Sequence, residues 1–255
     1  MKHLWKVLVV MAVMLVLVVI PAITLASNGG VVSSKAPTLE KIIFIHWWKG
    51  NVSRSDIARV PKPPLCYKFL TPTKIKWNQL PVNYVINPTN APYLSENLIC
   101  STVTNSGETW DGVTGKELFT DYTACLIDYT ATYGVQNYKN AIVFGNYPTI
   151  GVIAVTTVWY NPATKSIVEF YIMFDTDWRW GDAEATPTVD SNDSTAVMDL
   201  QNIAIHELGH GVGLADVYES ACSVVTMYGY SNYEETQKRT LELSDIIGLQ
   251  TLYGK

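Results

Sequence analysis

The sequence has few charged residues, and the charge that it carries is slightly acidic. Asp, Glu, Lys and Arg make up 16% of the 255 residues, and the formal net charge is −5 at pH 7. No basic patch emerges along the chain, although such a patch is typical of proteins that bind nucleic acids. The composition therefore argues against nucleic acid as the main partner. The hydrophobic content of 48% supplies a sizeable core.

Only one apolar run is long enough to span a membrane, and it lies at the N-terminus. Lys2 and Lys6 precede an almost unbroken apolar run from Val7 to Ile23, and Thr24-Leu25-Ala26 then places small residues where a signal peptidase cleaves. This pattern predicts a signal peptide over residues 1–26, with an uncleaved membrane anchor as the alternative. In either case we expect the rest of the chain to be exported, as a secreted or a cell-surface protein.

Cysteine is also scarce, and its spacing excludes some uses. No two of the four cysteines stand at C-x-x-C spacing, which argues against a cysteine zinc site or a redox motif. An even number of cysteines in an exported chain predicts disulfides, with three possible pairings. The residues concerned are Cys66, Cys100, Cys125 and Cys222.

Prolines 61, 63 and 64 predict a stiff linker, because each fixes φ and removes a hydrogen-bond donor. We expect an N-terminal segment over residues 27–70, a possible propeptide, and a main domain over residues 71–255. Residues 41–48 of the first part suit a short buried strand. We interpret His46 there as a packed or exposed strand histidine rather than a metal ligand.

The main domain alternates strand and helix patterns, which predicts an α+β fold with a twisted, mixed β-sheet of about four to five strands and three main helices. The expected strands cover residues 80–87, 141–144, 151–160 and 167–174, and the last two form an antiparallel hairpin. The expected helices begin at Ser95, Asp199 and Ser244, each acting as an N-cap.

The stretch HELGHGVGLAD, residues 206–216, is the chemically most informative part of the chain. His206 and His210 stand four residues apart on the expected helix, so both rings can point at one ion. Glu207 can reach a water on that ion. Gly213 can break the helix, because glycine tolerates φ > 0, and the chain can then turn back and offer Asp216 as a third ligand.

The scarcity of histidine limits the choice of the third ligand. Of the four histidines, His3 lies in the targeting segment, His46 lies far upstream, and none follows His210. The third ligand is therefore a carboxylate, with Asp216 as the nearest well-placed candidate, or His46 brought in from elsewhere. Catalytic zinc sites keep three protein ligands and one open position. A water there would lose its proton to Glu207, which would pass it to the leaving amine.

These residues resemble a known family. HELGHGVGLAD is similar to the zinc signature of the metzincin metalloproteases, with Asp216 where a third histidine usually stands. Met227 in TMYGY resembles the methionine turn that lies under the metal in that clan. The matrixin subgroup is the most similar one, on the evidence of Trp77, residues 81–87, Phe174-Asp175 followed by Trp180, and the last helix over residues 243–254. The resemblance covers about residues 71–255.

The resemblance implies a secreted zinc-dependent endopeptidase with a metzincin-like catalytic domain. It implies one catalytic Zn²⁺, a polypeptide substrate, and membrane contact only through the N-terminal segment if that segment is uncleaved. The substrate would lie extended along residues 153–160 as an added strand. The implied residues are the ligands His206, His210 and Asp216, the general base Glu207, the methionine-turn residue Met227, and the pocket residues Tyr228 and Tyr230.

Some features depart from the matrixin pattern. The extra histidines of a second, structural zinc site are absent, so one zinc is expected. Calcium is possible at Asp175, Asp177 or Asp182, although these also suit a solvated acidic loop. Cys66 does not stand in the "PRCG" setting of a matrixin propeptide cysteine, so we interpret it as a disulfide cysteine.

Two alternatives remain open at the level of the sequence. One is a thermolysin-like arrangement in which Glu234 or Glu235 is the third ligand, against which Gly213 and Met227 argue. The other is a non-catalytic secreted or surface binding protein that retains the metzincin fold, against which the intact Glu207 argues.

Overall fold

The structure is a computed structural model, and it describes residues 38–50, 65–91, 93–121, 125–185 and 195–255. All of these belong to one compact unit that begins at Pro37. The predicted signal peptide or anchor, residues 1–26, lies outside the described residues. Within the described ranges, no helix is both long enough and apolar enough to cross a membrane.

The core of the unit is a six-stranded mixed β-sheet, which confirms the predicted sheet type. Its strand order is β10-β1-β5-β6-β4-β3. The β1–β5 and β5–β6 pairs are antiparallel and the other three are parallel. The bounds are β1 (Glu40–Trp48), β3 (Val85–Asn87), β4 (Ala141–Gly145), β5 (Val152–Asn161), β6 (Ser166–Asp175) and β10 (Tyr230–Ser231). Two short pairs lie beside it, β2 (Lys68–Phe69) with β9 (Leu214–Ala215), and β7 (Trp180–Gly181) with β8 (Met198–Asp199).

Strands β5 and β6 form the predicted hairpin at the centre of the sheet. Their sequences, VIAVTTVWYN and SIVEFYIMFD, are rich in β-branched and aromatic residues, which favour strands. Nearly all of these side chains are buried, as expected for strands that are covered on both faces. The side chain of Asn161 accepts hydrogen bonds from the backbone N–H groups of Ala163 and Thr164, which closes the connecting turn.

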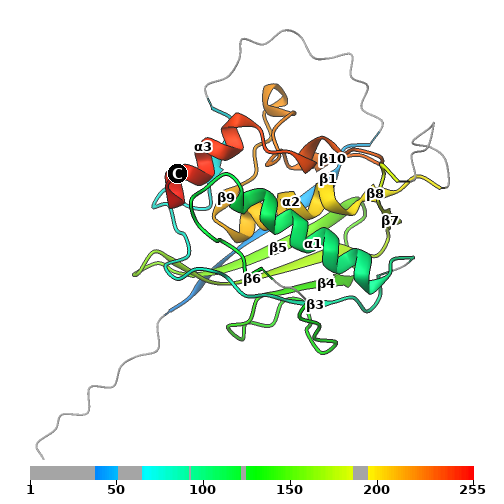
Figure 1. Ribbon diagram of the computed structural model, residues 1–255, viewed down its shortest axis with the longest axis horizontal. Coiled ribbons are helices and arrows are strands. Elements are labelled where there is room, and N and C mark those ends of the chain that lie inside the picture. The colour runs from blue at the N-terminus through cyan, green and yellow to red at the C-terminus, as the bar shows by residue number, and fades with distance from the viewer. Residues whose placement is uncertain (1–37, 51–64, 92, 122–124, 186–194) are drawn as a thin grey trace, which may run out of the picture. The chain divides into compact units, whose positions relative to one another are not determined.

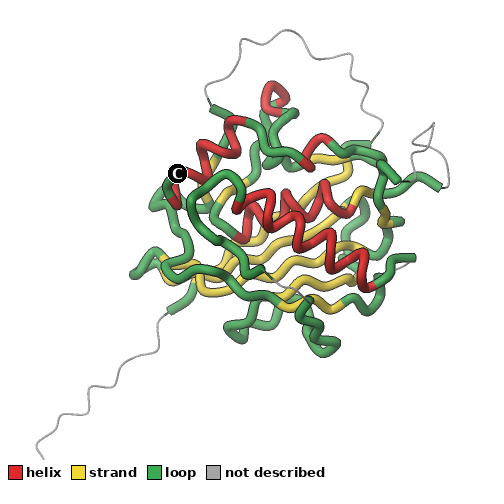
Figure 2. The backbone as a smooth tube through the Cα atoms, in the orientation of Figure 1, coloured by secondary structure: helices red, strands yellow, loops and turns green. Residues whose placement is uncertain are grey.

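Two helices, α1 (Glu96–Asp111) and α2 (Leu200–Gly211), lie across the same face of the sheet (Figures 1 and 2). Both begin at the predicted N-caps. The Ser95 side chain accepts from Leu98 N at 3.2 Å, and the Asp199 side chain accepts from Asn202 N at 2.7 Å. Helix α2 is buried along almost its whole length, because α1 covers one side and the sheet the other.

The predicted cap of the last helix, α3 (Leu243–Tyr253), was wrong. Glu242 is the N-cap, and it forms a capping box with Asp245. Ser244 instead lies in the first turn, where its hydroxyl accepts a hydrogen bond from Cys66 N at 3.0 Å. Two short 3₁₀ helices, η2 (Ser220–Cys222) and η3 (Gln237–Arg239), precede α3.

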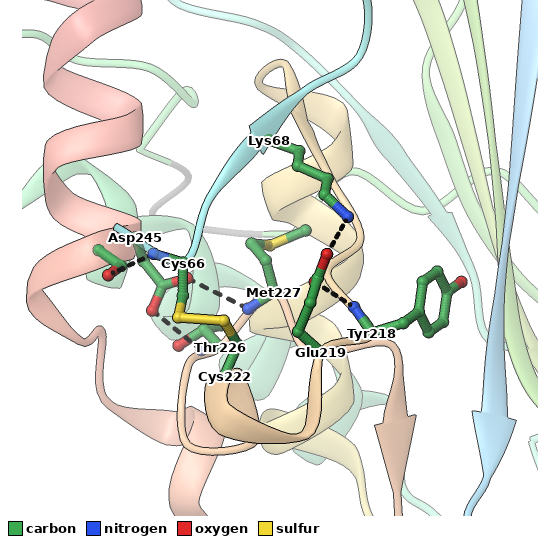
Figure 3. Close-up of a disulfide and its surroundings, with 9 residues drawn as sticks. Cys66, Lys68, Tyr218, Glu219, Cys222, Thr226, Met227 and Asp245 are labelled. Carbon is green, nitrogen blue, oxygen red and sulfur yellow. Dashed lines mark hydrogen bonds and ion pairs between the residues drawn. A yellow bond between two sulfur atoms is a disulfide. The ribbon is translucent and has the colours of Figure 1, made fainter. Parts of the chain in front are cut away.

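The four cysteines form two disulfides, Cys66–Cys222 and Cys100–Cys125. The first fastens the segment before β2 to the loop before residues 226–227, and Lys68 and Glu219 form an ion pair of 2.9 Å beside it (Figure 3). The sequence left three pairings open, and the structure contains this one.

Strand β1 lies inside the sheet although the sequence suggested a domain boundary near residue 70. It pairs with β5 from Glu40 to Trp47, and in Figure 1 it is the blue strand that passes behind α2. Together with β10, this strand brings the sheet to six strands, above the four to five that were expected. It also brings the N-terminal part of the described chain under the C-terminal half of α2.

Candidate metal centre

Helix α2 and the turn after it bring His206, His210 and Asp216 together, all three buried. The helix ends at Gly211, and two residues later Gly213 adopts φ +112°, a backbone conformation that other residues rarely adopt. A Cβ at this position would meet Leu252 Cδ1 at 2.8 Å and a backbone oxygen at 3.0 Å. The turn therefore requires glycine for two reasons, and it directs Asp216 back toward the helix.

The spacing of the three side chains fits one tetrahedral ion. Asp216 Oδ1 lies 3.1 Å from His206 Nε2 and 3.5 Å from His210 Nε2. Zinc bonds of 2.0–2.1 Å place tetrahedral ligand atoms about 3.3 Å apart. His206 Nε2 and Asp216 Oδ1 are also buried without a hydrogen-bond partner, which is costly unless a cation satisfies them. The donor set therefore fits zinc.

Each candidate ligand is oriented by a second group. His206 Nδ1 faces the carbonyl oxygen of Thr226 at 2.7 Å, and His210 Nδ1 faces that of Leu214 at 2.9 Å. A carbonyl only accepts, so each ring carries its proton on Nδ1 and turns the lone pair of Nε2 toward the centre. The Tyr218 hydroxyl donates to Asp216 Oδ2 at 2.9 Å, which leaves Oδ1 for the ion.

Glu207 lies beside this cluster with its two carboxylate oxygens in different surroundings. Oε2 accepts a hydrogen bond of 2.5 Å from the Thr156 hydroxyl on β5. Oε1 is buried without a hydrogen-bond partner and faces His46 Nδ1 at 3.3 Å. The carboxylate is therefore fixed through one oxygen and open toward the cluster through the other.

His46, which the sequence did not favour as a ligand, lies in the centre. It is 1% exposed, and its ring meets that of His206 edge-on with centroids 4.0 Å apart. One of its ring nitrogens lies within 4.8 Å of ligand atoms of both His206 and Glu207. Two residues earlier on the same strand, Phe44 stacks on His210 with centroids 4.1 Å apart.

Burial and neighbouring charge set the protonation of these groups. Burial, and then the charge of His206, lowers the pKa of His46 to about 3, so its imidazole is neutral at physiological pH. Burial alone would raise the pKa of Asp216, but His210 and His206 hold it far below the ordinary value. Burial also acts to raise the pKa of Glu207, yet the three histidines together lower it. The centre is thus built from carboxylates and at least one neutral imidazole, the forms that bind zinc.

The turn at Met227 supports α2 from below. Asp245 of α3 accepts hydrogen bonds from Thr226 N at 2.9 Å and Met227 N at 3.2 Å (Figure 3). A Cβ on Gly209 would come within 2.4 Å of Met227 Sδ and 2.8 Å of Trp110. The methionine is therefore in direct contact with the turn of α2 that lies between the two histidines.

The other residues singled out from the sequence lie as follows. Tyr230 pairs with β1 in the sheet, and Tyr228 is buried next to the Cys66–Cys222 disulfide. Glu235 pairs with Lys238, and Glu234 accepts from Val197 N, so neither is in the cluster around His206.

The three acidic side chains considered for calcium have other partners. Asp175 accepts from two backbone N–H groups, those of Tyr147 and Asp177. Asp177 accepts from Asn146 at 2.8 Å, and Asp182 pairs with Arg239 at 2.6 Å. These contacts stabilise the loop after β6, and calcium there stays a prediction.

Thr156 and Tyr218 were not anticipated in the centre, and His46 was considered only as an alternative third ligand. Thr156 and His46 lie on strands whose pairing joins residues more than 100 positions apart, so no local pattern marks them. Tyr218 lies two residues beyond Asp216, and that proximity is the one signal that could have identified it.

A family model described as Matrixin matches residues 76–254. The chain is also similar to metalloendoproteinase 4-MMP of Arabidopsis thaliana, with 34% identity over 65 residues. That alignment covers 26% of this chain and 18% of the plant protein.

Proposed function

This chain belongs to the matrixin family, and on that premise we propose that it is an exported zinc-dependent endopeptidase. The family supports the metalloendopeptidase class. The observation that carries the proposal for this particular chain is the convergence of His206, His210 and Asp216 beside the carboxylate of Glu207.

In this proposal His206 Nε2, His210 Nε2 and Asp216 Oδ1 hold one zinc ion. The oriented Nδ1–H groups, the Tyr218 hydroxyl and the two orphaned atoms support that assignment. When bound, zinc supplies Lewis acidity toward a water and toward a peptide carbonyl.

Glu207 acts as the general base and then as the general acid. Its Oε1 takes the proton that the attacking water loses and gives it to the nitrogen of the leaving amine. The Thr156 hydroxyl holds Oε2, so that Oε1 is the oxygen which remains free to move the proton. Met227 and Asp245 keep the floor of the site rigid through the contacts described above.

The substrate in this proposal is an extended polypeptide that pairs with β5, with Tyr228 and Tyr230 at the wall of the pocket beside the cleaved bond. Backbone pairing gives affinity that is largely independent of sequence. Export is supported by the two disulfides, because such bonds persist mainly in oxidising compartments. We propose residues 1–26 as the signal peptide and residues 27–70 as a segment that precedes the catalytic domain.

Hydrolysis of a generic protein substrate tests the activity. We expect it to be lost on addition of a zinc chelator and to fall by about 10²–10⁴-fold in Glu207→Ala, with bound zinc unchanged. Thr157→Ala on β5 is a control, because its side chain contacts Tyr133 rather than Glu207. A zinc-loaded Glu207→Ala protein as active as the parent would refute the peptidase and leave a non-catalytic binding protein.

A further inference from the structure

Tyr218 differs from the other polar groups of the metal centre because it is open to solvent. Its hydroxyl donates to Asp216 Oδ2 at 2.9 Å, while 43% of the residue stays exposed. By contrast, His206, Glu207 and His210 are at most 1% exposed. Tyr218 therefore brings a hydrogen-bond donor to the side of the centre from which a substrate can approach.

The ring of Tyr218 is held in place by the backbone at Gly229. A Cβ on Gly229 would lie 2.4 Å from Cε1 of this ring and 3.0 Å from its hydroxyl oxygen, so the ring fills the space that a side chain there would need. Tyr230 packs edge-on against the same ring, with centroids 5.4 Å apart. In Figure 3 the side chain points away from the nearby disulfide. The ring is thus fixed, whereas its O–H bond can still rotate toward another acceptor.

Tyr218 and Glu207 approach the centre from two different strands of the sheet. Glu207 is tied to β5 through the Thr156 hydroxyl, and Tyr218 packs against Gly229, the residue before β10. Strands β5 and β10 are not neighbours, because β1 lies between them. A peptide bond that reaches the centre between these strands therefore has the general base on one side and the phenol on the other.

The aspartate among the candidate ligands gives such a donor a task. A carboxylate carries a full negative charge and a neutral imidazole carries none, so Asp216 cancels more of an ion's positive charge than a third histidine would. We expect a site with this ligand to polarise a carbonyl less. More of the negative charge that develops on the carbonyl oxygen is then left for the protein's own donors to stabilise.

The phenol has a reason to change its acceptor during the reaction. In the resting site it donates to Asp216, whose charge is spread over two oxygens. The tetrahedral species formed by attack on a peptide carbonyl carries its charge on one oxygen, and hydrogen bonds to such concentrated charge are stronger. A phenol with a pKa of about 10 or above also keeps its proton at neutral pH.

We propose that Tyr218 is a second catalytic residue, whose hydroxyl donates a hydrogen bond to the oxyanion formed on the carbonyl of the cleaved peptide bond. This rests on the zinc peptidase of the proposed function. The O–H bond turns from Asp216 Oδ2 to the oxyanion, its proton stays on the phenol, and Glu207 alone transfers protons. Because the contact is made only after the charge has formed, it lowers the barrier without tightening substrate binding.

Two ligands separate this role from the orientation of Asp216. A phosphinic peptide carries a negatively charged tetrahedral group at the cleaved bond, and binding of the parent peptide can be measured on the inactive Glu207→Ala protein. At equal, measured zinc occupancy, we expect Tyr218→Phe to weaken the phosphinic peptide at least about tenfold. Parent-peptide affinity should be the same in Glu207→Ala and Glu207→Ala/Tyr218→Phe. An unchanged affinity for the phosphinic peptide, or an equal loss for both ligands, would overturn the proposal.

Tyr129→Phe is the matched control. It removes a phenol hydroxyl that also donates to a carboxylate, that of Glu96 at 2.8 Å, but neither residue belongs to the cluster around His206. We expect this variant to bind both ligands as tightly as the wild type. A loss of phosphinic-peptide affinity as large as that of Tyr218→Phe would show that the effect is not specific to the hydroxyl at the centre.

Steady-state hydrolysis of a short peptide distinguishes failure of this role from failure of the peptidase. At saturating zinc, we expect Tyr218→Phe to lower kcat by about 10–10²-fold with little change in KM, less than a buried oxyanion donor because water can partly replace an exposed hydroxyl. An active wild type with the same kcat in Tyr218→Phe would reject Tyr218 and leave the peptidase. A wild type without turnover would reject the peptidase, and the two ligand affinities would still decide whether Tyr218 binds the tetrahedral anion.

Discussion

The three buried histidines of the centre are held in two different ways. His206 and His210 lie on α2, and each turns Nδ1 to a backbone carbonyl and Nε2 inward. His46 lies on β1, turns Nε2 to the Ser231 hydroxyl and points Nδ1 inward. The first two are fixed by the covalent geometry of one helix and its following turns, whereas the third is held only by strand pairing and side-chain contacts.

This difference separates two histidines that share one element from one that does not. A change in α2 moves His206 and His210 together, because both belong to the same buried element. A change in β1 moves His46 alone, because His46 reaches the centre from a strand that pairs with β5 and β10. The same chemical group therefore contributes to one centre from two elements that are held differently.

Removing a histidine of α2 should have the largest effect on zinc binding. It is therefore the strongest test of the difference between the α2 histidines and His46. We expect His210→Ala to weaken zinc binding by at least about 100-fold, since a direct ligand contributes more than the groups that orient it. His46→Ala should retain zinc, because three ligands suffice. Competition with a chromogenic zinc chelator measures both. Equal losses in the two variants would mean that His46 contributes as much to zinc binding as the histidines of α2.

Tyr218 tests whether a residue that only orients a candidate ligand also contributes to zinc affinity. Its hydroxyl orients Asp216, and we expect Tyr218→Phe to weaken zinc binding by about tenfold, the lower end of such effects. The lower end applies because Tyr218 is 43% exposed, so a water can partly replace the hydroxyl. Tyr230→Phe is the matched control in the same aromatic pair. The same chelator competition applies, and an unchanged affinity in Tyr218→Phe would mean that Asp216 needs no such support.

The smallest effect is expected at an acidic cluster on α1 and the loop after it, which shares no residue with the histidine centre. Contact with Asp121, then burial and the charges of Asp111 and Glu117, raises the pKa of Glu108 to about 7 from 4.5. The folded chain thus binds a proton between these pH values that the unfolded chain releases. Stability should therefore fall as pH rises from about 4.5 to 7.

Glu108→Gln should remove that dependence. We expect its melting temperature to exceed the wild type at pH 8 by no more than about 2 °C, because the side chain is exposed, and to show no gain at pH 4.5. Thermal unfolding at the two pH values measures this. We expect zinc affinity to be unchanged in the same variant. A changed affinity would show that the acidic cluster and the histidine centre are coupled.

The features that could be predicted from the sequence are those set by residues that lie close together along the chain. The pair His206 and His210 is set by the period of one helix, and the turn at Gly213 by a local steric rule, so both were accessible from the motif. The hairpin of β5 and β6 was accessible for the same reason. Ser244 was misjudged as a cap because Glu242, two residues earlier, forms the capping box with Asp245.

The position of His46 could not be predicted in this way. It depends on the pairing of His46 with Ala154 and on the hydroxyl of Ser231, both far along the chain. The residues before it, Ile42 to Ile45, are apolar on both faces of the strand, so no alternation indicates which face is inward. Only the tertiary structure distinguishes a packed histidine from one that reaches the metal centre.

The disulfide between Cys66 and Cys222 also bears on the stability of the whole catalytic domain. The two cysteines are 156 residues apart in the sequence, so the bond restricts the unfolded chain over most of the domain. A loop closure of this length is expected to stabilise the folded chain by about 2–5 kcal/mol.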